Sequence, residues 1–505
     1  MRDFDKRCMS QALQALLIAG FVLCAPLSVQ ASDFPFRPSP RLDPAKVNVL
    51  SAADAGRTGE FQLKGPLSHL KMEVIDWKSA DQSLHWTIEV TETADYTVTA
   101  LLRVDNDAPI RMTVSTGVGE INAPFVRDPR GFQSRSAFTT PLRLTTGRHV
   151  LTLRLQPSPE QAPFNAEVIS LELTRPDVVA ALHKEALALR ADVRWMGKEP
   201  FGVMFHWTKR TMPRMGPQKS YEQAVKDFDV EQFADQVAST GAGFVVMTTS
   251  HSDQYIPAPN KALDAILPGR TASRDMVADL IAALGKRNIK LFLYYHLGPI
   301  EDPAWTAATH QWDKDQTRFF ANWQAIISEM GERYGTGLAG WWFDDGLYNY
   351  YYRSPDWSAL YRAAHAGNPQ RAVCFNSWNG TLATEFQDYE CGEEVAPGGL
   401  NAFLNTDGSM NGTLTKGGDG RVQAGAFKGL QSASTFVVET DWIHNKRDTE
   451  AAAPKWTPQA LASTLSMIKA HGGAPIVDML IYQDGQIAPR SLETLREAAR
   501  IAGLR

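Results

Sequence analysis

Hydrophobic and polar residues alternate with a period of two between residues 45 and 176, and turn residues separate the runs. The clearest runs are 86–90 (Trp-Thr-Ile-Glu-Val), 149–155 and 168–173. A strand with one buried and one exposed face produces this alternation. Several such strands at short spacing predict an all-β sandwich. A helical pattern over 177–199 then predicts a connector.

The pattern changes after residue 200, where short apolar strands alternate with amphipathic helices. Their continuous hydrophobic character is typical of parallel strands that are covered on both faces. Eight units of this kind in about 300 residues have the size of a TIM barrel. The sequence therefore predicts an α/β fold, a (β/α)8 barrel over 200–505 preceded by the all-β sandwich. The strand candidates are 201–207, 243–251, 289–296, 340–345, 372–378, 388–394, 435–442 and 474–481.

Several helices of this region carry start and stop signals. Asp229 precedes one helix, which Gly241 ends, and Ser273 and Gly285 bracket another. Thr457-Pro458 predicts an N-cap followed by a proline at the first helical position, with Gly472 at the other end.

The first 31 residues predict a signal peptide. Lys6 and Arg7 precede an apolar run over 12–29, and Val29-Gln30-Ala31 has the small residues of a cleavage site. No later segment has the roughly 18 apolar residues of a spanning helix. We therefore expect cleavage after Ala31, a secreted or periplasmic protein, and no membrane association after cleavage.

Charge and cysteine content exclude some classes of protein. The net charge of −5 is not concentrated in blocks, so no basic face for nucleic acid is expected. A neutral polar partner such as a carbohydrate fits better. Cleavage leaves only Cys374 and Cys391, too few for a fold built on disulfides. They lie on neighbouring predicted strands and form either a disulfide, worth roughly 3 kcal/mol, or two buried thiols.

Polar residues at the ends of the predicted barrel strands indicate an active site, because TIM barrels carry theirs at the carboxyl ends of the strands. Glycosidases need two carboxylates there, and Asp344 is the candidate nucleophile. Glu393 is the candidate acid/base, with Glu390 or Glu394 as the fallback. The candidate substrate-binding residues are His206, Trp207, His251, Asp253, Tyr295, His296, Trp342, Trp378 and Trp442. Their tryptophans are suited to the apolar face of a sugar ring.

Several of these segments resemble glycoside hydrolase family 29, the α-L-fucosidases. Residues 201–207 resemble the opening strand of that family, where the histidine contacts the sugar, and 249–255 resemble its next strand end. Trp342-Phe343-Asp344 reproduces the Trp-x-Asp of the nucleophile, with Asp345 as an additional neighbour. Residues 388–393 keep the Asp-to-Glu spacing of the acid/base segment. Further matches are Arg274-Asp275, Tyr294-Tyr295, Gly472-Gly473 and Asp484-Gly485-Gln486-Ile487.

The resemblance implies a retaining exo-glycosidase that acts on α-L-fucosides or closely related glycosides. Asp344 would form a glycosyl-enzyme, and Glu393 would act first as acid and then as base. It implies no cofactor and no metal, and a fucosylated glycan or related polysaccharide as partner. The N-terminal sandwich resembles carbohydrate-binding modules, although Trp86 and Tyr96 are expected in its core.

The chain also departs from the family pattern. Ser252 replaces the second residue of a His-His pair, Ser250 replaces a lysine, and Trp378 stands where the family has arginine. These positions hold sugar hydroxyls in the family, so the sequence predicts a hydrolase more firmly than it predicts fucose as the substrate.

Two other classes of function remain open at this point. One is a metal-dependent TIM-barrel hydrolase, because His206, His251 and His296 end three consecutive strands with Asp253 and Asp344 nearby, a set of ligands that suits zinc. The other is a non-catalytic carbohydrate-binding protein, suggested by the missing arginine and the sandwich.

Overall fold

The computed structural model of the 505-residue chain describes most of the chain after residue 40. The expected signal peptide, Asp345, Trp378, Glu393 and Glu394 lie outside the described residues. No helix within the described part has the length and hydropathy required to cross a membrane. The described residues are 41–65, 73–105, 109–127, 133–157, 163–297, 301–311, 313, 316–344, 355–376, 382, 384–392, 414–424 and 427–505.

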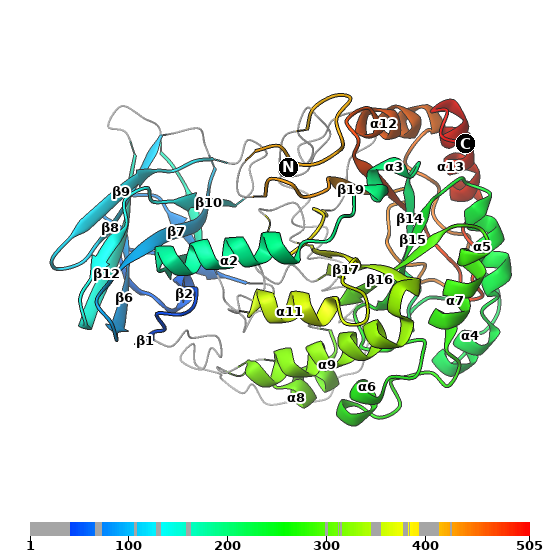
Figure 1. The fold of residues 1–505 in the computed structure, drawn as a ribbon, viewed down its shortest axis with the longest axis horizontal. Coiled ribbons are helices and arrows are strands. Elements are labelled where there is room, and N and C mark those ends of the chain that lie inside the picture. The colour runs from blue at the N-terminus through cyan, green and yellow to red at the C-terminus, as the bar shows by residue number, and fades with distance from the viewer. Residues whose placement is uncertain are drawn as a thin grey trace. The chain divides into compact units, whose positions relative to one another are not determined.

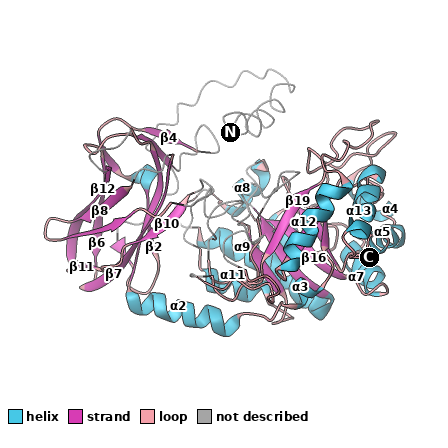
Figure 2. Cartoon of the chain, turned by 90° about the horizontal axis from the view of Figure 1, so that it is seen from above, coloured by secondary structure: helices cyan, strands magenta, loops and turns pink. Residues whose placement is uncertain are grey.

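The N-terminal region consists of two mainly antiparallel sheets that share one hydrophobic core (Figures 1 and 2). Trp86 and Tyr96 are buried in that core, as expected. The first sheet contains β1 (Arg41–Leu42), β3 (Gly56–Thr58), β6 (Ser83–Val90), β8 (Ile110–Ser115), β9 (Glu120–Pro124) and β12 (Gly147–Pro157). The second contains β2 (Asn48–Ser51), β4 (Gln62–Lys64), β5 (Glu73–Trp77), β7 (Ala94–Val104), β10 (Ser134–Ala137), β11 (Leu142–Leu144) and β13 (Ala166–Thr174).

The C-terminal region is built on a curled parallel sheet of seven strands in the order β18-β17-β16-β15-β14-β20-β19. The strands are β14 (Gly202–Phe205), β15 (Phe244–Ser250), β16 (Lys290–His296), β17 (Leu338–Asp344), β18 (Ala372–Phe375), β19 (Ala433–Val437) and β20 (Ala474–Asp478). The mixed α/β prediction with a β-rich N-terminal region is confirmed. The predicted strand over 388–394 is not present as a strand in the described part, where Tyr389 forms one parallel bridge to Gln431.

Helices accompany these strands along the chain (Figure 1). They are α2 (Pro176–Leu189), α3 (Trp195–Lys198), α4 (Tyr221–Asp227), α5 (Val230–Ala238), α6 (Lys261–Ile266), α7 (Met276–Gly285), α8 (Pro303–Thr309), α9 (Thr317–Tyr334), α11 (Trp357–Ala364), α12 (Pro458–Ala470) and α13 (Pro489–Ile501), with the short 3-10 helices η2 (Ala52–Asp54) and η3 (Gly335–Gly337). The expected caps Asp229 and Thr457 accept hydrogen bonds from Gln232 N and Ala460 N. The expected start at Ser273 was wrong by two residues, because the Asp275 carboxylate caps α7.

Side chains of the curled sheet alternate between two separate cores. Residues such as Val203, Phe205 and Phe343 pack outward in a cluster that includes helix residues. The inward cluster contains Met204, Val246, Phe292, Tyr294, Trp342, Cys374 and Ile476. Because successive side chains of a strand point to opposite faces, each residue two positions after an inward one also faces inward.

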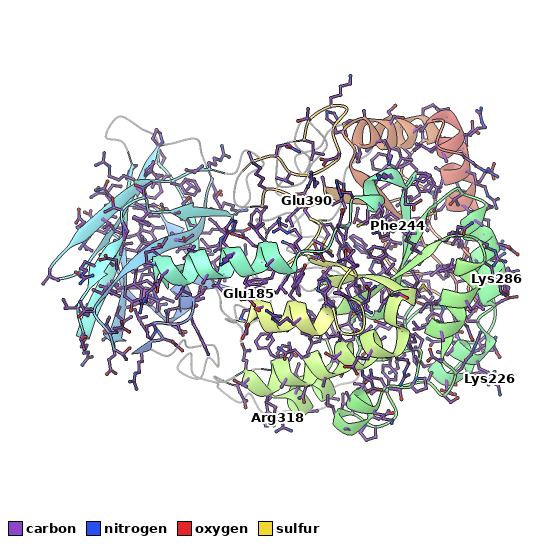
Figure 3. All side chains as sticks on the ribbon, viewed as in Figure 1. Glu185, Lys226, Phe244, Lys286, Arg318 and Glu390 are labelled. Atoms are coloured by element: carbon purple, nitrogen blue, oxygen red, sulfur yellow. A yellow bond between two sulfur atoms is a disulfide. The ribbon has the colours of Figure 1, made fainter. Side chains whose placement is uncertain are left out.

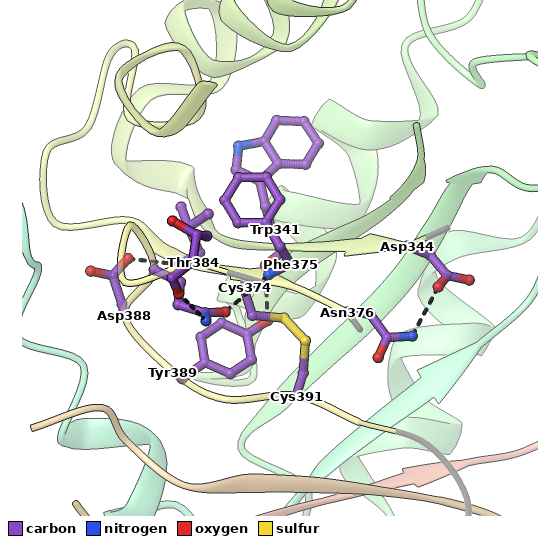
Figure 4. The surroundings of a disulfide bond; sticks show 11 residues. Trp341, Asp344, Cys374, Phe375, Asn376, Thr384, Asp388, Tyr389 and Cys391 are labelled. Atoms are coloured by element: carbon purple, nitrogen blue, oxygen red, sulfur yellow. Dashed lines mark hydrogen bonds between the residues drawn. A yellow bond between two sulfur atoms is a disulfide. The ribbon is translucent and has the colours of Figure 1, made fainter. Parts of the chain in front are cut away.

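A disulfide joins β18 to the segment that follows it. Cys374 and Cys391 are both fully buried, and their Cα atoms lie 6.2 Å apart (Figure 4). Of the two states that the sequence left open, the structure contains the disulfide. It ties the segment before Glu393 to the strand that ends beside Asp344.

Replacing both cysteines by alanine is expected to lower the free energy of unfolding by about 3 kcal/mol, because the cross-link restricts a loop of 17 residues in the unfolded chain. Urea denaturation of the variant and of the wild type, with and without reductant, measures this. Wild-type protein whose unfolding midpoint does not respond to reductant would contradict it.

A buried carboxylate fastens the end of the connector to this sheet. The side chain of Asp388 is 1% exposed and accepts hydrogen bonds from Ala191 N at 2.7 Å and Val373 N at 2.9 Å. The Tyr361 hydroxyl of α11 donates a third hydrogen bond to it. A buried carboxylate needs such donors, so the chain after α2, helix α11 and strand β18 meet at one residue.

Candidate active site

A layer of polar side chains follows the inward apolar residues at the carboxyl ends of the parallel strands. Parallel strands bring these ends to one edge of a sheet, where ligands bind in α/β folds. The layer consists of His206, Thr248, Tyr294, His296, Asp344, Asn376 and Asp478. With the exception of Thr248 and Asn376, each carries an ionisable group.

Asp344 is the last residue of β17 and is held by two donors from neighbouring strands. Its Oδ1 accepts from Asn376 Nδ2 at 2.8 Å (Figure 4). Its Oδ2 accepts from the Tyr294 hydroxyl. The side chain is 8% exposed. The Tyr294 ring stacks on Trp342, with ring centroids 5.2 Å apart. Both oxygens of the carboxylate are therefore oriented before any substrate binds.

Replacing Tyr294 by phenylalanine or Asn376 by alanine is expected to lower kcat by roughly 10- to 100-fold each, because a hydrogen bond to a charged group contributes about 1.5–3 kcal/mol. Steady-state kinetics measures the loss. Tyr295→Phe is the matched control, since its ring packs against Trp323 on the outer side of the sheet. An equal loss in that control would contradict the assignment.

The imidazole ring of His206 packs against several other rings of the site. Its Nδ1 is 3.4 Å from Thr248 Oγ1, and its Nε2 is 3.5 Å from Asp478 Oδ2. Its ring centroid lies 4.8 Å from that of Tyr294 and 5.5 Å from that of Trp442. The structure thus brings the predicted residues His206 and Trp442 to the same place as the hydroxyl that holds Asp344.

The other two predicted histidines lie beside it. The ring centroid of His251 is 5.1 Å from that of His206 and 5.5 Å from that of His296. Burial lowers the pKa of His251 and of His296 to about 3, and burial and these two histidines also lower the pKa of His206. All three imidazoles are neutral near pH 7, a state suited to hydrogen bonds with neutral hydroxyl groups.

The metal-dependent alternative needs several His and carboxylate side chains that converge on one point. Within the described part of the chain, no group of three or more His, Cys, Asp and Glu side chains is arranged to hold a metal ion. Asp253, which that alternative included, forms an ion pair with Arg210 at 2.7 Å. As a substrate contact, Asp253 stays a prediction.

Two of the predicted substrate-binding residues lie on the outer side of the sheet. Trp207 packs against Tyr221 and Phe228, and its Nε1 donates to the carbonyl oxygen of Gln483 at 3.0 Å. Tyr295 belongs to the same outward cluster. The structure therefore does not bring Trp207 and Tyr295 to Asp344.

The fallback acid/base Glu390 also lies away from Asp344. Its buried carboxylate accepts a hydrogen bond from Ser432 Oγ at 2.6 Å. Ser432 immediately precedes β19, so Glu390 lies at the amino end of that strand (Figure 3). Asp344 is the last residue of β17 and therefore lies at the carboxyl ends of the parallel strands, opposite to Glu390. Glu393, Glu394 and Trp378 lie outside the described residues, and their roles stay predictions.

Four residues of the site were missed in the candidate list taken from the sequence. Each stands two positions after an inward apolar residue: Thr248 after Val246, Tyr294 after Phe292, Asn376 after Cys374 and Asp478 after Ile476. Alternation along each strand was the signal that would have found them.

A comparison with protein families identifies the family of this chain. The family described as Alpha-L-fucosidase matches residues 218–501, which is more than half of the sequence. The chain belongs to the alpha-L-fucosidase family. The match begins before β15 and ends in α13, and it contains Asp344, Asn376 and Asp478.

Individual relatives of this family are distant. The chain is 28% identical over 138 residues to the tissue alpha-L-fucosidase of Homo sapiens, covering 20% of this chain and 29% of that protein. A structure of an alpha-L-fucosidase from Bacteroides thetaiotaomicron aligns with 16% identity and a TM-score of 0.43, covering 62% of this chain and 74% of the other. One from Lactobacillus casei with alpha-L-fucose aligns with 15% identity and a TM-score of 0.41, covering 61% and 97%.

Proposed function

We propose that the protein is a retaining exo-glycosidase that hydrolyses α-L-fucosides or closely related glycosides. The observation that carries the proposal is the Asp344 carboxylate, oriented by Tyr294 and Asn376 in a chain of the alpha-L-fucosidase family. The chain spans 29% of the length of the human relative it matches, so the activity is inferred from this site as well as from the family.

The proposed reaction has two displacements at the anomeric carbon. In the first, an Asp344 oxygen forms a bond to that carbon, the glycosidic bond breaks, and Glu393 gives its proton to the departing oxygen. In the second, Glu393 takes a proton from water, the water oxygen bonds to the anomeric carbon, and the ester bond to Asp344 breaks. The hydrogen bonds from Tyr294 and Asn376 keep the attacking carboxylate in position throughout.

Glu393 is proposed as the acid/base because it follows Cys391 by two residues. The disulfide holds Cys391 next to Cys374, and Cys374 is paired in register with Trp342, two residues before Asp344. A chain spans at most about 3.6 Å per residue, so this tether supports a glutamate that follows Cys391 closely, and the Asp388-to-Glu393 spacing favours Glu393 over Glu394. Glu390 faces Ser432 instead.

We further propose that the curled sheet closes into a (β/α)8 barrel, with the segment that contains Tyr389 between its two edge strands. Tyr389 bridges Gln431 in parallel orientation, just before β19. On the other side, Asp388 N donates to Val373 O of β18. These contacts connect the two edge strands of the described sheet through the same short segment.

Export with cleavage after Ala31 is part of the proposal. The Cys374–Cys391 disulfide supports it, since disulfides persist in oxidising compartments and are rare in the cytosol. N-terminal sequencing of the mature protein tests the cleavage site.

A panel of aryl glycosides tests the substrate, and a fluorinated L-fucosyl donor tests the mechanism. Release of the phenol from the α-L-fucoside, and a stable sugar label on the peptide that contains Asp344, are the expected results. Turnover of another sugar would limit the family relationship to fold and mechanism. Absence of any turnover together with sugar binding would favour the carbohydrate-binding alternative.

A further inference from the structure

An ion pair stands beside the site, and nothing in the proposed reaction uses it. The guanidinium of Arg210 donates to both oxygens of Asp253, from Nε to Oδ2 at 2.7 Å and from Nη2 to Oδ1 at 3.3 Å. Arg210 belongs to the segment after β14, and Asp253 belongs to the segment after β15. These two strands are parallel neighbours, so the pair joins two adjacent strand ends at the edge of the sheet where Asp344 lies.

The turn that carries Arg210 is fixed shortly after His206 in the chain. Thr211 is buried, its N donates to Thr208 O at 3.0 Å, and its Oγ1 accepts from Thr208 N at 2.8 Å. The backbone N of Arg210 donates to Thr208 Oγ1 at 3.0 Å. The side chain of Arg210 therefore starts from a defined position, and the two parallel bonds to the carboxylate orient its planar end.

The ion pair lies close to the nucleophile and shares His251 with it as a neighbour. Asp253 follows His251 by two residues, so their Cα atoms are at most about 7 Å apart. The His251 ring stacks on that of Tyr294, with centroids 5.6 Å apart, and the Tyr294 hydroxyl donates to Asp344. Burial is the main cause of the lowered pKa of His251, and Asp344 raises this pKa while Arg210 lowers it. Both charges thus act on the same imidazole.

Exposure to solvent increases from the nucleophile to the ion pair. Asp344 is 8% exposed, whereas the side chains of Asp253 and Arg210 are 18% and 44% exposed. The anomeric carbon has to reach the buried carboxylate of Asp344, so the leaving group extends from that carbon toward the solvent. The ion pair therefore stands beside the route of the leaving group.

Both members of the pair keep hydrogen-bonding capacity. Nη1 of Arg210 donates to no residue in the part of the chain that the structure describes. The carboxylate of Asp253 has about four lone-pair positions, of which Arg210 uses two. A guanidinium only donates and an ionised carboxylate only accepts, so together they match the hydroxyl and amide groups of a second sugar. A partly exposed ion pair adds little to the stability of a fold.

We propose that Arg210 and Asp253 bind the leaving group of the substrate, and that Arg210 makes the protein selective for a leaving group that is itself a sugar. The inference rests on the proposed function, since it places the sugar to be released at Asp344. Arg210 precedes the residues that match the family, which begin at 218, and it lies outside the segments that resemble the family in sequence. The family relationship therefore assigns it no role.

The test compares Arg210→Gln with the wild type on α-L-fucosyl fluoride and on α-L-fucosyl disaccharides of different linkage. The leaving group of the fluoride is a single atom, which cannot span to the ion pair. For the disaccharide that the wild type hydrolyses best, kcat/KM is expected to fall roughly 10- to 100-fold, the range for a hydrogen bond to a charged group. For the fluoride, variant and wild type are expected to agree within about twofold, as for sites that share no contact.

Arg214→Gln is the matched control for this experiment. Arg214 lies in the same segment, its side chain is 41% exposed, and its Nε donates to Glu450 Oε1 at 2.7 Å. It is expected to hydrolyse the fluoride and the disaccharides as the wild type does. If Arg210→Gln does not fold by thermal denaturation, Asp253→Asn is measured on the same substrates and must show the same difference between them.

Equal losses on the fluoride and on the disaccharides would overturn the inference, since the ion pair would then act on the structure of the site alone. Unchanged hydrolysis of every disaccharide would overturn it as well. A loss in Arg214→Gln as large as that in Arg210→Gln would also contradict it, because the effect would then belong to the whole segment.

Failure of the proposed function gives a different result. Wild-type protein that hydrolyses no α-L-fucoside contradicts that function, and the fluoride and disaccharides of whichever sugar the aryl panel releases then decide the inference. A wild type that releases no sugar contradicts both.

Discussion

Replacing Asp344 by glycine is expected to lower kcat on an aryl α-L-fucoside by on the order of 10⁴-fold or more, as loss of the nucleophile does in other enzymes with covalent intermediates. The substitution removes the group that forms the glycosyl-enzyme, while the other inward residues of the site remain. Rate measurements at saturating substrate test it, with thermal unfolding as the check on the fold.

Added azide gives a sharper result for the same variant. A small anion fits the space of the missing carboxylate and attacks the anomeric carbon directly, so activity is expected to recover with formation of a glycosyl azide of inverted configuration. Asp345→Gly is the control, because its carboxylate is adjacent in sequence. A larger loss and azide recovery in the Asp345 variant would move the nucleophile to that residue.

Replacing Glu393 by glutamine is expected to lower turnover of fucosides with poor leaving groups by about 10²- to 10⁴-fold, the usual contribution of a general acid. An acidic phenol leaves without a proton, so the first displacement of an aryl fucoside should be far less affected. The second displacement still needs a base, so the glycosyl-enzyme should accumulate and a burst of phenol should precede slow turnover.

Glu390→Gln and Glu394→Gln are the matched controls for this experiment, since three glutamates lie within five residues. The alkaline limb of the pH profile of kcat/KM should disappear in the Glu393 variant alone. If that limb and the leaving-group dependence are lost in Glu394→Gln instead, the acid/base is Glu394. Glu390→Gln should chiefly change the stability of the protein, because the Glu390 carboxylate accepts a hydrogen bond from Ser432 at the amino end of β19.

Much of the fold was predictable because the two kinds of strand have different hydrophobic patterns. Strands of the β-rich region alternate between apolar and polar residues, and the parallel strands are continuous apolar runs. The segment at 388–394 was harder, because only one bridge, at Tyr389, identifies its pairing in the described residues. Its apolar content is low, and polar contacts such as those of Asp388 and Glu390 hold it.

The sequence placed the candidate residues at the ends of strands, but a strand end alone does not say which face of the strand a side chain occupies. His206 and Trp207 are adjacent, as are Tyr294 and Tyr295, and only one of each pair faces inward. Asn376 and Asp478 were overlooked because neither belongs to a motif that was matched. The contact between Asp478 and His206 joins residues far apart in the sequence, and only the register of β14 and β20 reveals it.

The hydrogen bond from Ala191 N to Asp388 has a consequence for dividing the protein into parts. A chain shortened so that it begins after Ala191 would leave a buried carboxylate short of one donor. That carboxylate lies beside β18, the strand that carries Cys374 and ends just before Asn376. The connector after α2 is therefore a structural component of the C-terminal region, and a fragment intended to retain the site should begin within α2, before Ala191.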